Sequence, residues 1–499
     1  MRSLWLDTHR SPSTSDPFTP GTHYDTVVVG AGITGLTTAV LLARSGQKVG
    51  VVEARSTGAV ATGNTTAKLS LLQGTTLSQI RHHQSDKVLN AYVEANREGQ
   101  AWLLRHLQDH GVPYQLRTAY TYAITQEGTD TLREEMAACQ VAGVSTVWTA
   151  ETELPFPVSG ALSLEDQAQF HPMDVLATLA EELRRRGGHL MEGARVTGAG
   201  VRTPLRVKTT QGDLEADKLV LATGTSILDR GGYFAKLAGH RSYALSFRVP
   251  QQLIPQGMYL SADAPDRTLR SVPLEDEELL LVGGNDHIVG RTSSHQHAVD
   301  DLVAWTEQNF PGAERTHAWS AQDYRSVNLI PFFGTLPRGG GNIYLATGFN
   351  KWGMTNGVAA ALAITAQILG GSPSWATTMG HRITTPSDVV TAAKDTLAVG
   401  KQMASGWTSA ERATLPDQAP PEGRGVVGRR AGRPVAVSTV EGTTCAVSAV
   451  CPHMGGILEW NDAELSWDCP LHASRFAPDG TLLEGPAVQD LEAKPFQVP

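Results

Sequence analysis

The chain has 499 residues, with 41 Lys and Arg against 50 Asp and Glu, so its formal net charge is −9. This balance gives no electrostatic support to binding of nucleic acid or of an anionic membrane surface. Hydrophobic residues make up 41% of the chain, which excludes wholesale disorder, and the 50 glycines indicate many tight turns. We therefore expect about three folding units and no nucleic-acid partner.

Cysteine usage and the N-terminal segment bear on the compartment. Four cysteines are too few for a disulfide scaffold, so a reducing compartment is the default. The first twenty residues lack the apolar run of a secretory signal. The apolar stretch 26–43 contains three glycines and is typical of a strand, a turn and a helix rather than a membrane span. We expect a cytoplasmic protein without a membrane span.

Strands and helices alternate along most of the chain. Residues 1–24 are rich in Ser, Thr and Pro and predict a loosely attached N-terminal arm. A strand, a glycine turn, a helix to about residue 45 and a second strand to residue 53 follow. Residues from about 225 to 331 mix strands and short loops, as a substrate domain inserted into an α/β fold would. Further helices are predicted over 76–110, 175–186 and 355–369, and buried strands over 218–224 and 343–349.

The C-terminal part differs in composition. Residues 386–423 form a connecting segment, and its last part, 413–423, is rich in Pro and typical of a linker. Residues 424–499 contain short β-like runs separated by glycine turns, which predicts a small all-β module.

A glycine-rich turn follows the first strand and opens the first helix. Residues 30–35 read Gly-Ala-Gly-Ile-Thr-Gly, and Glu53 ends the next strand. These glycines permit a tight turn, close approach of the backbone to a pyrophosphate and close packing of helix on strand. A carboxylate at Glu53 would accept the ribose hydroxyls. The pattern predicts a dinucleotide site formed by Gly30, Ala31, Gly32, Ile33, Thr34, Gly35, Glu53, Ala54 and Arg55.

A second match to the same spacing, at 423–428, follows a Pro-rich segment rather than a strand, and no apolar helix comes after it. We do not expect it to bind a dinucleotide.

Two further motifs accompany the glycine turn: Ala-Thr-Gly at 222–224, which closes a late strand, and a second strand-to-helix turn at 348–357. With these motifs, residues 25–385 resemble the FAD-dependent oxidoreductases of the D-amino-acid oxidase/glycine oxidase family. The resemblance implies an α/β (α+β) fold in two parts, a Rossmann-like FAD-binding domain and a mixed-sheet substrate domain. It implies FAD contacts at Thr66, Ala67 and Lys68 along the diphosphate and ribityl chain, at Val196 beside the adenine, at Thr223 and Gly224, and at Gly348, Trp352, Gly353, Met354 and Thr355 under the flavin pyrimidine ring.

The segment 319–334 resembles another signature of this family, although Asn328 stands where many members carry Asp. We interpret Lys68 as a phosphate or backbone contact rather than a base. No second phosphate-binding fingerprint is present. We therefore expect no dedicated NAD(P)H domain and an organic substrate as the source of electrons.

Several residues between 233 and 352 are candidates for the substrate side of the flavin. The segment 283–290 resembles a family segment near the substrate, which makes His287 the candidate catalytic residue; a plain structural role is equally consistent. Metal binding by His295 and His297 is disfavoured because they lie in a polar loop. Arg241 would hold a substrate carboxylate or lie at the surface. The aromatic residues Tyr233, Phe234, Tyr243 and Trp352 would line a pocket or pack in the core.

Three of the four cysteines lie in the last 55 residues, and two of them belong to Cys-x-His and Cys-x-x-His motifs separated by fifteen residues. Two loops that each supply one thiolate and one imidazole are the ligand set of a Rieske [2Fe–2S] centre. Two Cys and two His also suit tetrahedral zinc, but the spacing and the β-rich flanks are unlike a zinc finger. The predicted metal ligands are Cys451, His453, Cys469 and His472.

With its flanking glycines and a Gly-Pro at 485–486, the segment 424–499 resembles Rieske ferredoxin-type domains. Ala473 stands where the family usually has Gly, so we expect the loop to avoid a left-handed conformation there. Respiratory-type members place a disulfide where this chain has Gly456 and Leu471, so the resemblance is to the soluble ferredoxin or oxygenase class. Cys445 and Cys139 are expected to be packing residues.

The two resemblances together imply an enzyme, an FAD-dependent oxidoreductase with a Rieske [2Fe–2S] centre. They imply a small amine or amino-acid-like substrate that loses a hydride to FAD, and one-electron transfer through the cluster to O2, a ferredoxin or a quinone. Two alternatives stay open. In one, the flavin works as an oxidase or monooxygenase with O2 and the cluster is modulating or structural. In the other, the chain is an electron-transfer protein that serves a separate oxygenase.

Overall fold

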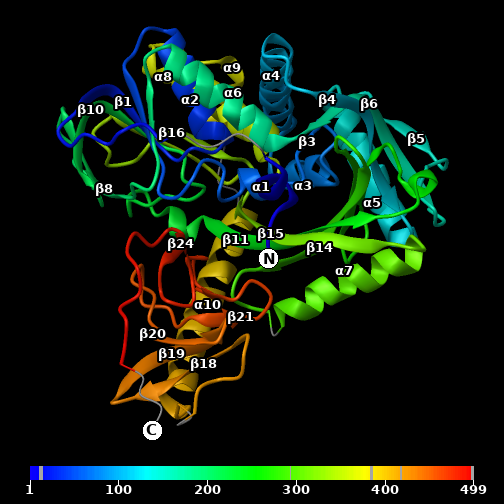
Figure 1. The fold of residues 1–499 in the computed structure, drawn as a ribbon. Helices are drawn as coiled ribbons and strands as arrows, with labels where there is room; N and C mark the ends of the chain where they lie inside the picture. The colour runs from blue at the N-terminus through cyan, green and yellow to red at the C-terminus, as the bar shows by residue number, and fades with distance from the viewer. Residues whose placement is uncertain (10–14, 293, 382–385, 416–417, 496–499) are drawn as a thin grey trace.

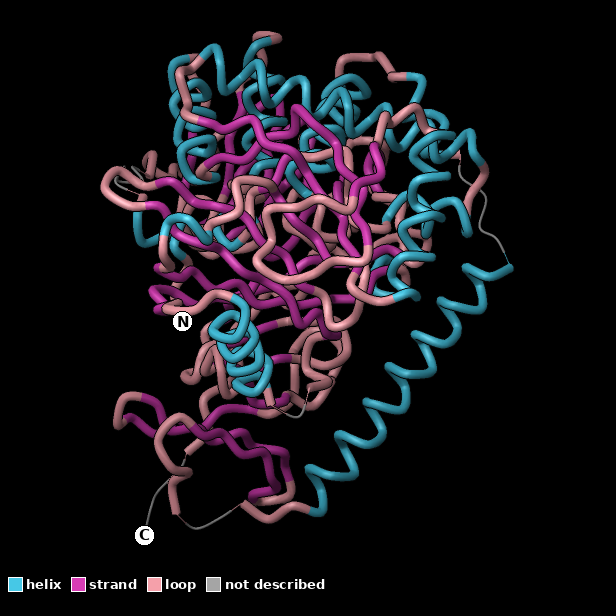
Figure 2. Tube along the Cα trace, turned by 90° about the vertical axis from the view of Figure 1, so that its right-hand side faces the viewer, coloured by secondary structure: helices cyan, strands magenta, loops and turns pink. Residues whose placement is uncertain are grey.

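The computed structural model describes residues 1–9, 15–292, 294–381, 386–415 and 418–495, and over 386–396 the backbone alone. Two large sheets and their helices form the upper part of the molecule (Figure 1). A small all-β domain lies below them, joined by the long helix α10 (Pro386–Arg412). Seen from the side, α10 descends along one edge of the molecule from the larger body to the β-domain (Figure 2).

The first sheet is the nucleotide-binding type that the glycine turn predicts. Its five central strands are parallel, and the apolar run of β1 is buried because helices and loops cover both faces of such a sheet. Helix α2 (Ile33–Arg44) starts directly after the glycine turn and packs between α6 (Pro172–Arg185) and α8 (Gly353–Ile368). The path of the sheet is β16 (Phe332–Thr335), β17 (Ile343–Thr347), β10 (Gly212–Leu221), β1 (His23–Val29), β2 (Val49–Val52) and β7 (His189–Met191), with β9 (Leu205–Thr209) on β10 and β8 (Val196–Ala199) on β9.

The second sheet has nine mostly antiparallel strands. Residues alternate between its two faces, so Ala244 packs toward the nucleotide-binding body while its neighbours Tyr243 and Leu245 pack toward α7 (His295–Asn309) on the opposite face. Its strands are β15 (Glu314–Ser326), β11 (Leu237–Arg248), β14 (Glu278–Ile288), β13 (Arg267–Pro273), β12 (Met258–Ser261), β4 (Tyr114–Ala123), β6 (Gly160–Phe170) and β3 (Lys68–Leu69), with β5 (Val147–Thr149) on β6.

A helical layer covers the end of the second sheet. The helix predicted over 76–110 is two helices, α3 (Thr76–His83) and α4 (Asp86–Asp109), with Gln84 and Ser85 between them. They pack with α5 (Gln126–Val141) and α9 (Ser374–Gly380) around a shared apolar core. Among the described residues, no helix has the length and apolarity that crossing a membrane requires.

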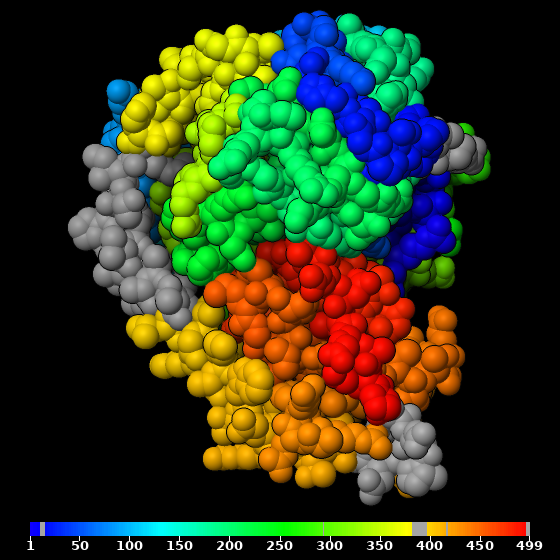
Figure 3. All heavy atoms as spheres, turned by 90° about the vertical axis from the view of Figure 1, so that its left-hand side faces the viewer, coloured from blue at the N-terminus to red at the C-terminus, as the bar shows by residue number. Residues whose placement is uncertain are grey.

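The C-terminal domain consists of two small antiparallel sheets, as predicted. One contains β18 (Arg424–Arg430), β19 (Arg433–Val440) and β20 (Thr443–Ser448). The other contains β21 (Glu459–Asn461), β22 (Ser466–Asp468), β23 (Arg475–Phe476) and β24 (Leu482–Glu484). The second glycine match lies on β18, an edge strand and not a helix start, so it offers no dinucleotide turn. In the space-filling view the red end of the chain lies directly against green segments of the large body (Figure 3).

The structure adds detail to the two segments outside the domains and corrects one expectation. The N-terminal arm is not loose at its start: α1 (Leu4–Thr8) buries Leu4 and Trp5, and the Trp5 indole donates to the Thr65 carbonyl at 2.6 Å. The connecting segment 386–423 is for the most part helix α10, which the sequence analysis did not predict. The Trp407 indole of α10 donates to the Gly455 carbonyl at 3.0 Å, which anchors the helix on the β-domain.

Candidate functional site

The glycine turn has no room for side chains at two positions. Gly30 has φ of 103°, and a Cβ there would lie 2.5 Å from the Ala222 carbonyl oxygen; a Cβ on Gly35 would lie 1.9 Å from the Gly30 carbonyl oxygen. Because α2 begins here, its unpaired N–H groups face the space beyond the turn, a setting that favours a phosphate.

Glu53 is fixed at the end of β2 beside this turn. Its carboxylate accepts hydrogen bonds from the backbone N–H groups of Ala31 at 2.9 Å and Arg55 at 2.8 Å. Burial raises the pKa of the Glu53 carboxyl, while these two bonds and the charges of Arg195 and Arg55 act in the opposite direction. The carboxylate is thus held by the turn itself in a position to accept further hydrogen bonds.

One cavity of about 320 Å³ extends from the glycine turn to the second sheet. This volume is in the range of small-molecule and cofactor sites. The predicted contact residues on its wall are Gly30, Gly32, Ile33, Thr34, Glu53, Ala54, Arg55, Thr66, Lys68, Val196, Thr223, Gly224, Trp352, Gly353 and Met354.

Five predicted contact residues are not on this wall. Ala31 and Gly35 act through the turn, as described above. Ala67 is fully buried, and Gly348 lies against Leu237 and Ser326. Thr355 turns away: its hydroxyl bonds the Trp352 carbonyl and accepts from Gln73. Contacts of these five residues with FAD stay predictions.

A polar group that the sequence did not reveal lines the end of the cavity at the second sheet: His240, Asp266, Arg267, Asp323 and Lys351. Lys351 contacts Asp266 at 3.4 Å and Asp286 at 3.1 Å, so it links the turn before α8 to the loops of the second sheet. Burial raises the pKa of the Asp323 carboxyl to about 6, although it accepts hydrogen bonds from backbone N–H groups including that of Lys351. In the sequence, Asp323 is one acid among the alternating residues of a strand. This pattern is too common to identify a site residue.

Lys68 is buried in the cavity wall, and the hydrogen-bond partners found for its ammonium group are neutral. It donates to the Tyr259 carbonyl at 3.1 Å and to the Thr268 hydroxyl. Burial, reinforced by the nearby charge of Arg270, lowers its pKa well below the usual range for lysine. The interpretation of Lys68 as a phosphate or backbone contact rather than a base stays a prediction.

His287 does not line the cavity, which corrects its assignment as the catalytic candidate. It is the cross-strand partner of Arg241, and neither residue is on the cavity wall. Its ring stacks on Tyr243 and lies 5.1 Å from the ring of His295. Burial lowers its pKa, as expected for a neutral histidine within the protein. The strand register, which has an irregularity between residues 241 and 243, turns it away from the substrate side.

Arg241 is neither at the surface nor available to a substrate carboxylate. It is buried behind the sheet, where it donates to Ser320 at 2.8 Å and to Gln322 at 2.7 Å. It also lies 3.7 Å from the carboxylate of Asp468, a fully buried residue of the C-terminal domain. The pair therefore connects the two parts of the protein.

The four predicted metal ligands come together at the top of the C-terminal domain. The rings of His453 and His472 lie 5.1 Å apart, and the sulfur atoms of Cys451 and Cys469 are buried next to each other. The neighbouring Cys469 thiol, with the N–H groups of His453 and Met454, lowers the pKa of the Cys451 thiol to about 7. Backbone N–H groups directed at sulfur suit an iron–sulfur cluster.

The geometry of these four side chains fits two irons better than one zinc ion. The Nδ1 atom of His472 is buried and has no hydrogen-bond partner in the described protein, as expected of a metal-facing nitrogen. Among described residues, the only His, Cys, Asp and Glu groups with three ligand atoms within 4.8 Å of one another are His106, His110 and Glu182. The Cys and His ligands are therefore more spread out than the ~4 Å separations that tetrahedral zinc bonds of ~2.0–2.3 Å require.

The group of His106, His110 and Glu182 is better explained without a metal. Arg44 donates two hydrogen bonds to the Glu182 carboxylate, at 2.8 and 2.7 Å, and Arg186 donates a third at 2.8 Å. These guanidinium groups already compensate the acid.

Ala473 corrects one expectation about the second ligand loop. It has φ of 66°, so the loop takes the left-handed conformation with Ala in place of the usual Gly. This costs about 1–2 kcal/mol in an alanine. The Ala473 N–H donates to the Cys469 carbonyl at 3.0 Å, which closes the loop around the ligand.

The C-terminal domain also forms part of the large cavity. Residues from β24 and the loop after it lie on the cavity wall, and Arg195 donates to the Leu482 carbonyl at 2.8 Å. Tyr324 lines the same cavity and donates to the Gly485 carbonyl at 3.2 Å. The wall residues from the C-terminal domain are Leu483, Glu484, Gly485, Ala487 and Val488.

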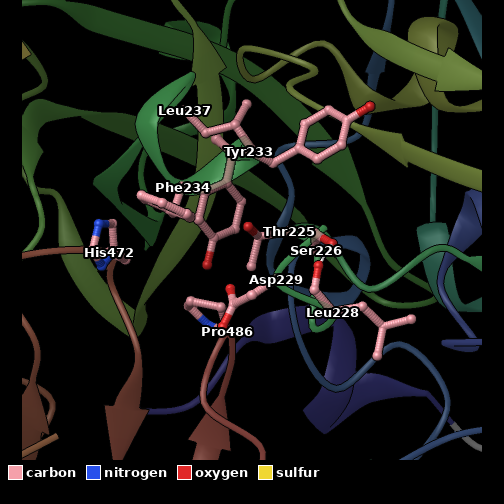
Figure 4. A pocket seen from close by; sticks show the side chains of 10 residues that line it. Thr225, Ser226, Leu228, Asp229, Tyr233, Phe234, Leu237, His472 and Pro486 are labelled. Atoms are coloured by element: carbon pink, nitrogen blue, oxygen red, sulfur yellow. Dashed lines mark hydrogen bonds between the residues drawn. The ribbon is translucent and has the colours of Figure 1, made fainter. Parts of the chain in front are cut away.

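A second, very small pocket of about 10 Å³ lies between His472 and residues of the large body. Tyr324 lines this pocket too, so one residue borders both spaces. Figure 4 shows Phe234 beside His472, with Asp229 and Pro486 below them. Tyr233 and Phe234 thus line the cluster side and not a substrate pocket, whereas Trp352 lines the large cavity.

Comparisons with known proteins agree with these two sites. Residues 25–367 match the family model of FAD dependent oxidoreductases, and residues 413–495 match that of the Rieske [2Fe-2S] domain. The chain is 30% identical over 97% of its length, and 97% of the relative's, to YhfW of Bacillus subtilis, which is named as a Rieske 2Fe-2S iron-sulfur protein. Over 19% of the chain and 49% of the relative it is 37% identical to a cytochrome b6-f complex iron-sulfur subunit of Nostoc.

Solved structures show the same fold for the larger body. L-proline dehydrogenase from P. horikoshii has a TM-score of 0.60 and 16% identity, over 72% of this chain and 96% of that one. Glycine oxidase from Geobacillus kaustophilus has a TM-score of 0.59 and 18% identity, over 71% and 96%. The chain therefore belongs to the FAD dependent oxidoreductase family and is an oxidoreductase that binds FAD and, in its C-terminal Rieske domain, a [2Fe–2S] cluster.

Proposed function

We propose that the protein oxidises a small amine or amino-acid-like substrate and passes the electrons singly through its Rieske domain. A hydride would pass from the carbon next to the amine nitrogen to FAD, the nitrogen would lose a proton, and the C–N bond would become an imine. The two electrons then leave one at a time to an external acceptor such as O2, a ferredoxin or a quinone. Bound FAD supplies a two-electron acceptor, and the [2Fe–2S] cluster supplies a one-electron carrier.

The residues on the cavity wall suit this role. We assign the pyrophosphate to the glycine turn and the start of α2, and the adenosine ribose to Glu53. Gly353 and Met354 lie at the start of α8, whose N–H groups would stabilise negative charge on a flavin ring. The side chains of Cys451, His453, Cys469 and His472 would bind the iron atoms of the cluster.

The polar end of the cavity favours an amine. Asp266 and Asp323 lie on the wall there, and the arginine and lysine beside them, Arg267 and Lys351, are each already paired with a carboxylate. Asp266 is itself the partner of Lys351, so Asp323 is the acid that an amine entering this end would meet. The C-terminal domain covers part of the cavity and would reduce the access of water to the reaction.

The observation that carries the proposal is the shared wall between the two sites. Tyr324 borders both the FAD cavity and the cluster pocket, and the segment 483–488 of the Rieske domain forms part of the cavity itself. A redox domain that builds the wall of a flavin site is positioned to exchange electrons with it.

The test is an anaerobic titration of the purified holoprotein with a panel of amines and amino acids. Flavin absorbance and the electron-paramagnetic signal of the reduced cluster are followed together. We expect one substrate class to bleach the flavin and to generate the cluster signal in proportion. Bleaching without a cluster signal would refute the internal transfer, and no bleaching by any amine would refute the substrate class.

A further inference from the structure

The two histidine ligands of the cluster face residues of the large body rather than solvent. The side chain of His453 is only 6% exposed, and its Nε2 atom lies 3.2 Å from a carboxylate oxygen of Asp229. Asp229 belongs to the loop between β10 and β11, which is part of the FAD-binding body. Because the Nε2 atom of His453 contacts the carboxylate, its Nδ1 atom is the one available to bind iron.

His472 has different surroundings. Its ring meets the ring of Phe234 edge to face, with centroids 5.6 Å apart. The remaining space between these residues is about 10 Å³, room for about one water molecule. An organic acceptor such as a quinone does not fit in this pocket, so His472 faces the large body across a space too small for one.

We propose that Asp229 is a positioning residue for the cluster: it orients His453, holds the histidine edge against the FAD-binding body and lowers the reduction potential. A carboxylate that accepts the outer N–H of a ligating imidazole fixes the ring and increases its basicity. Its negative charge favours the oxidised, more positive cluster over the reduced one. The effect of Asp229 on the rate at which electrons pass from FAD to the cluster rests on the proposed function, whereas its effect on the reduction potential does not.

The direct test is the midpoint potential of the cluster in the full-length holoprotein, measured by a redox titration followed by its electron-paramagnetic signal. Asp229→Asn keeps the shape and removes the charge. We expect the ratio of reduced to oxidised cluster at a fixed potential to rise about tenfold, a shift of about 59 mV for one electron. Asp229→Glu restores the carboxylate and should return the potential toward the original value.

Asp462→Asn is the matched control. Asp462 also contacts the large body, where it accepts from the N–H groups of His295 at 2.9 Å and Gln296 at 3.0 Å, but no contact with a cluster ligand is found for it. It should leave the potential unchanged. If Asp229→Asn incorporates the cluster and titrates like the original protein, or if the Asp462 variant shifts equally, the inference is wrong.

A second measurement separates this inference from the proposed function. The flavin is reduced by light with EDTA as the electron donor and without any candidate substrate, and the rate at which the cluster signal appears is recorded. A rate altered by Asp229→Asn but not by the Asp462 variant supports the positioning role. If the cluster of the unmodified protein never becomes reduced, the internal transfer fails, while the potential of the Asp229 variant still decides the role of that residue.

Discussion

The substitution Gly35→Ala tests whether the glycine turn holds FAD as the fold indicates. The new Cβ would lie 1.9 Å from the Gly30 carbonyl oxygen and 3.4 Å from Ala222 Cβ. Side-chain carbons are not accommodated below about 3 Å, so α2 must move by about 1 Å or the turn must deform. Such overpacking costs about 1–3 kcal/mol, which corresponds to about 5-fold to 150-fold weaker binding of FAD if the strain falls on the turn.

The assay compares FAD per protein after purification, binding of FAD to the apoprotein by fluorescence, and thermal unfolding with and without added FAD. Gly400→Ala is the control, because its Cβ would meet nothing within 4 Å on helix α10. The control should bind FAD normally and gain up to about 1 kcal/mol of stability. Normal FAD content and affinity in Gly35→Ala would refute the assignment of this turn to the cofactor.

Three further substitutions give separable outcomes. Trp5→Ala should cost about 3–5 kcal/mol of unfolding free energy, because the side chain is buried in the main core; little change in chemical denaturation would show that the N-terminal segment is dispensable. Glu182→Gln should destabilise at neutral pH, since the hydrogen bond from Arg44, opposed by burial, lowers the pKa of the Glu182 carboxyl to about 2. The contribution of the ionised carboxyl to the free energy of unfolding is complete above the unfolded pKa of about 4.5 and is lost as pH falls toward 2. The free energies of unfolding of the two proteins should therefore become equal in acid. A constant difference between them across this range would contradict the pKa shift. Arg241→Met should cost about 3–5 kcal/mol by leaving the buried carboxylate of Asp468 without one partner, and should make the C-terminal domain more sensitive to limited proteolysis, whereas unchanged cleavage would argue against a role in docking.

The parts of the site that depend on short spacings could be predicted from the sequence. The glycine turn with Glu53, and the two Cys and His motifs, each lie within one loop or between adjacent elements, so local spacing determines their geometry. The position of His287 could not be predicted in this way. It depends on strand register, and one irregular step beside residue 242 decides which face a whole segment presents.

Contacts between distant parts of the chain were also beyond the sequence. Nothing near Arg241 indicates that its acid lies more than two hundred residues away at Asp468. Trp5 belongs to a helix of five residues, which is too short for a periodic pattern. Residues 387–412, in helix α10, contain no proline and are rich in alanine, which is typical of a helix. The Pro-rich stretch at 413–423 that follows is typical of a linker.

The wall that the segment 483–488 adds to the FAD cavity also bears on how the protein is assembled. Residues 25–367, which match the flavoprotein family, are translated before the domain that closes this side of their cavity. The cavity is therefore most accessible while the C-terminal domain is still being made or has not yet docked. Acquisition of FAD before docking would then be the favoured order of maturation, and a chain that docked without FAD would have to separate its two parts again to admit it by this side.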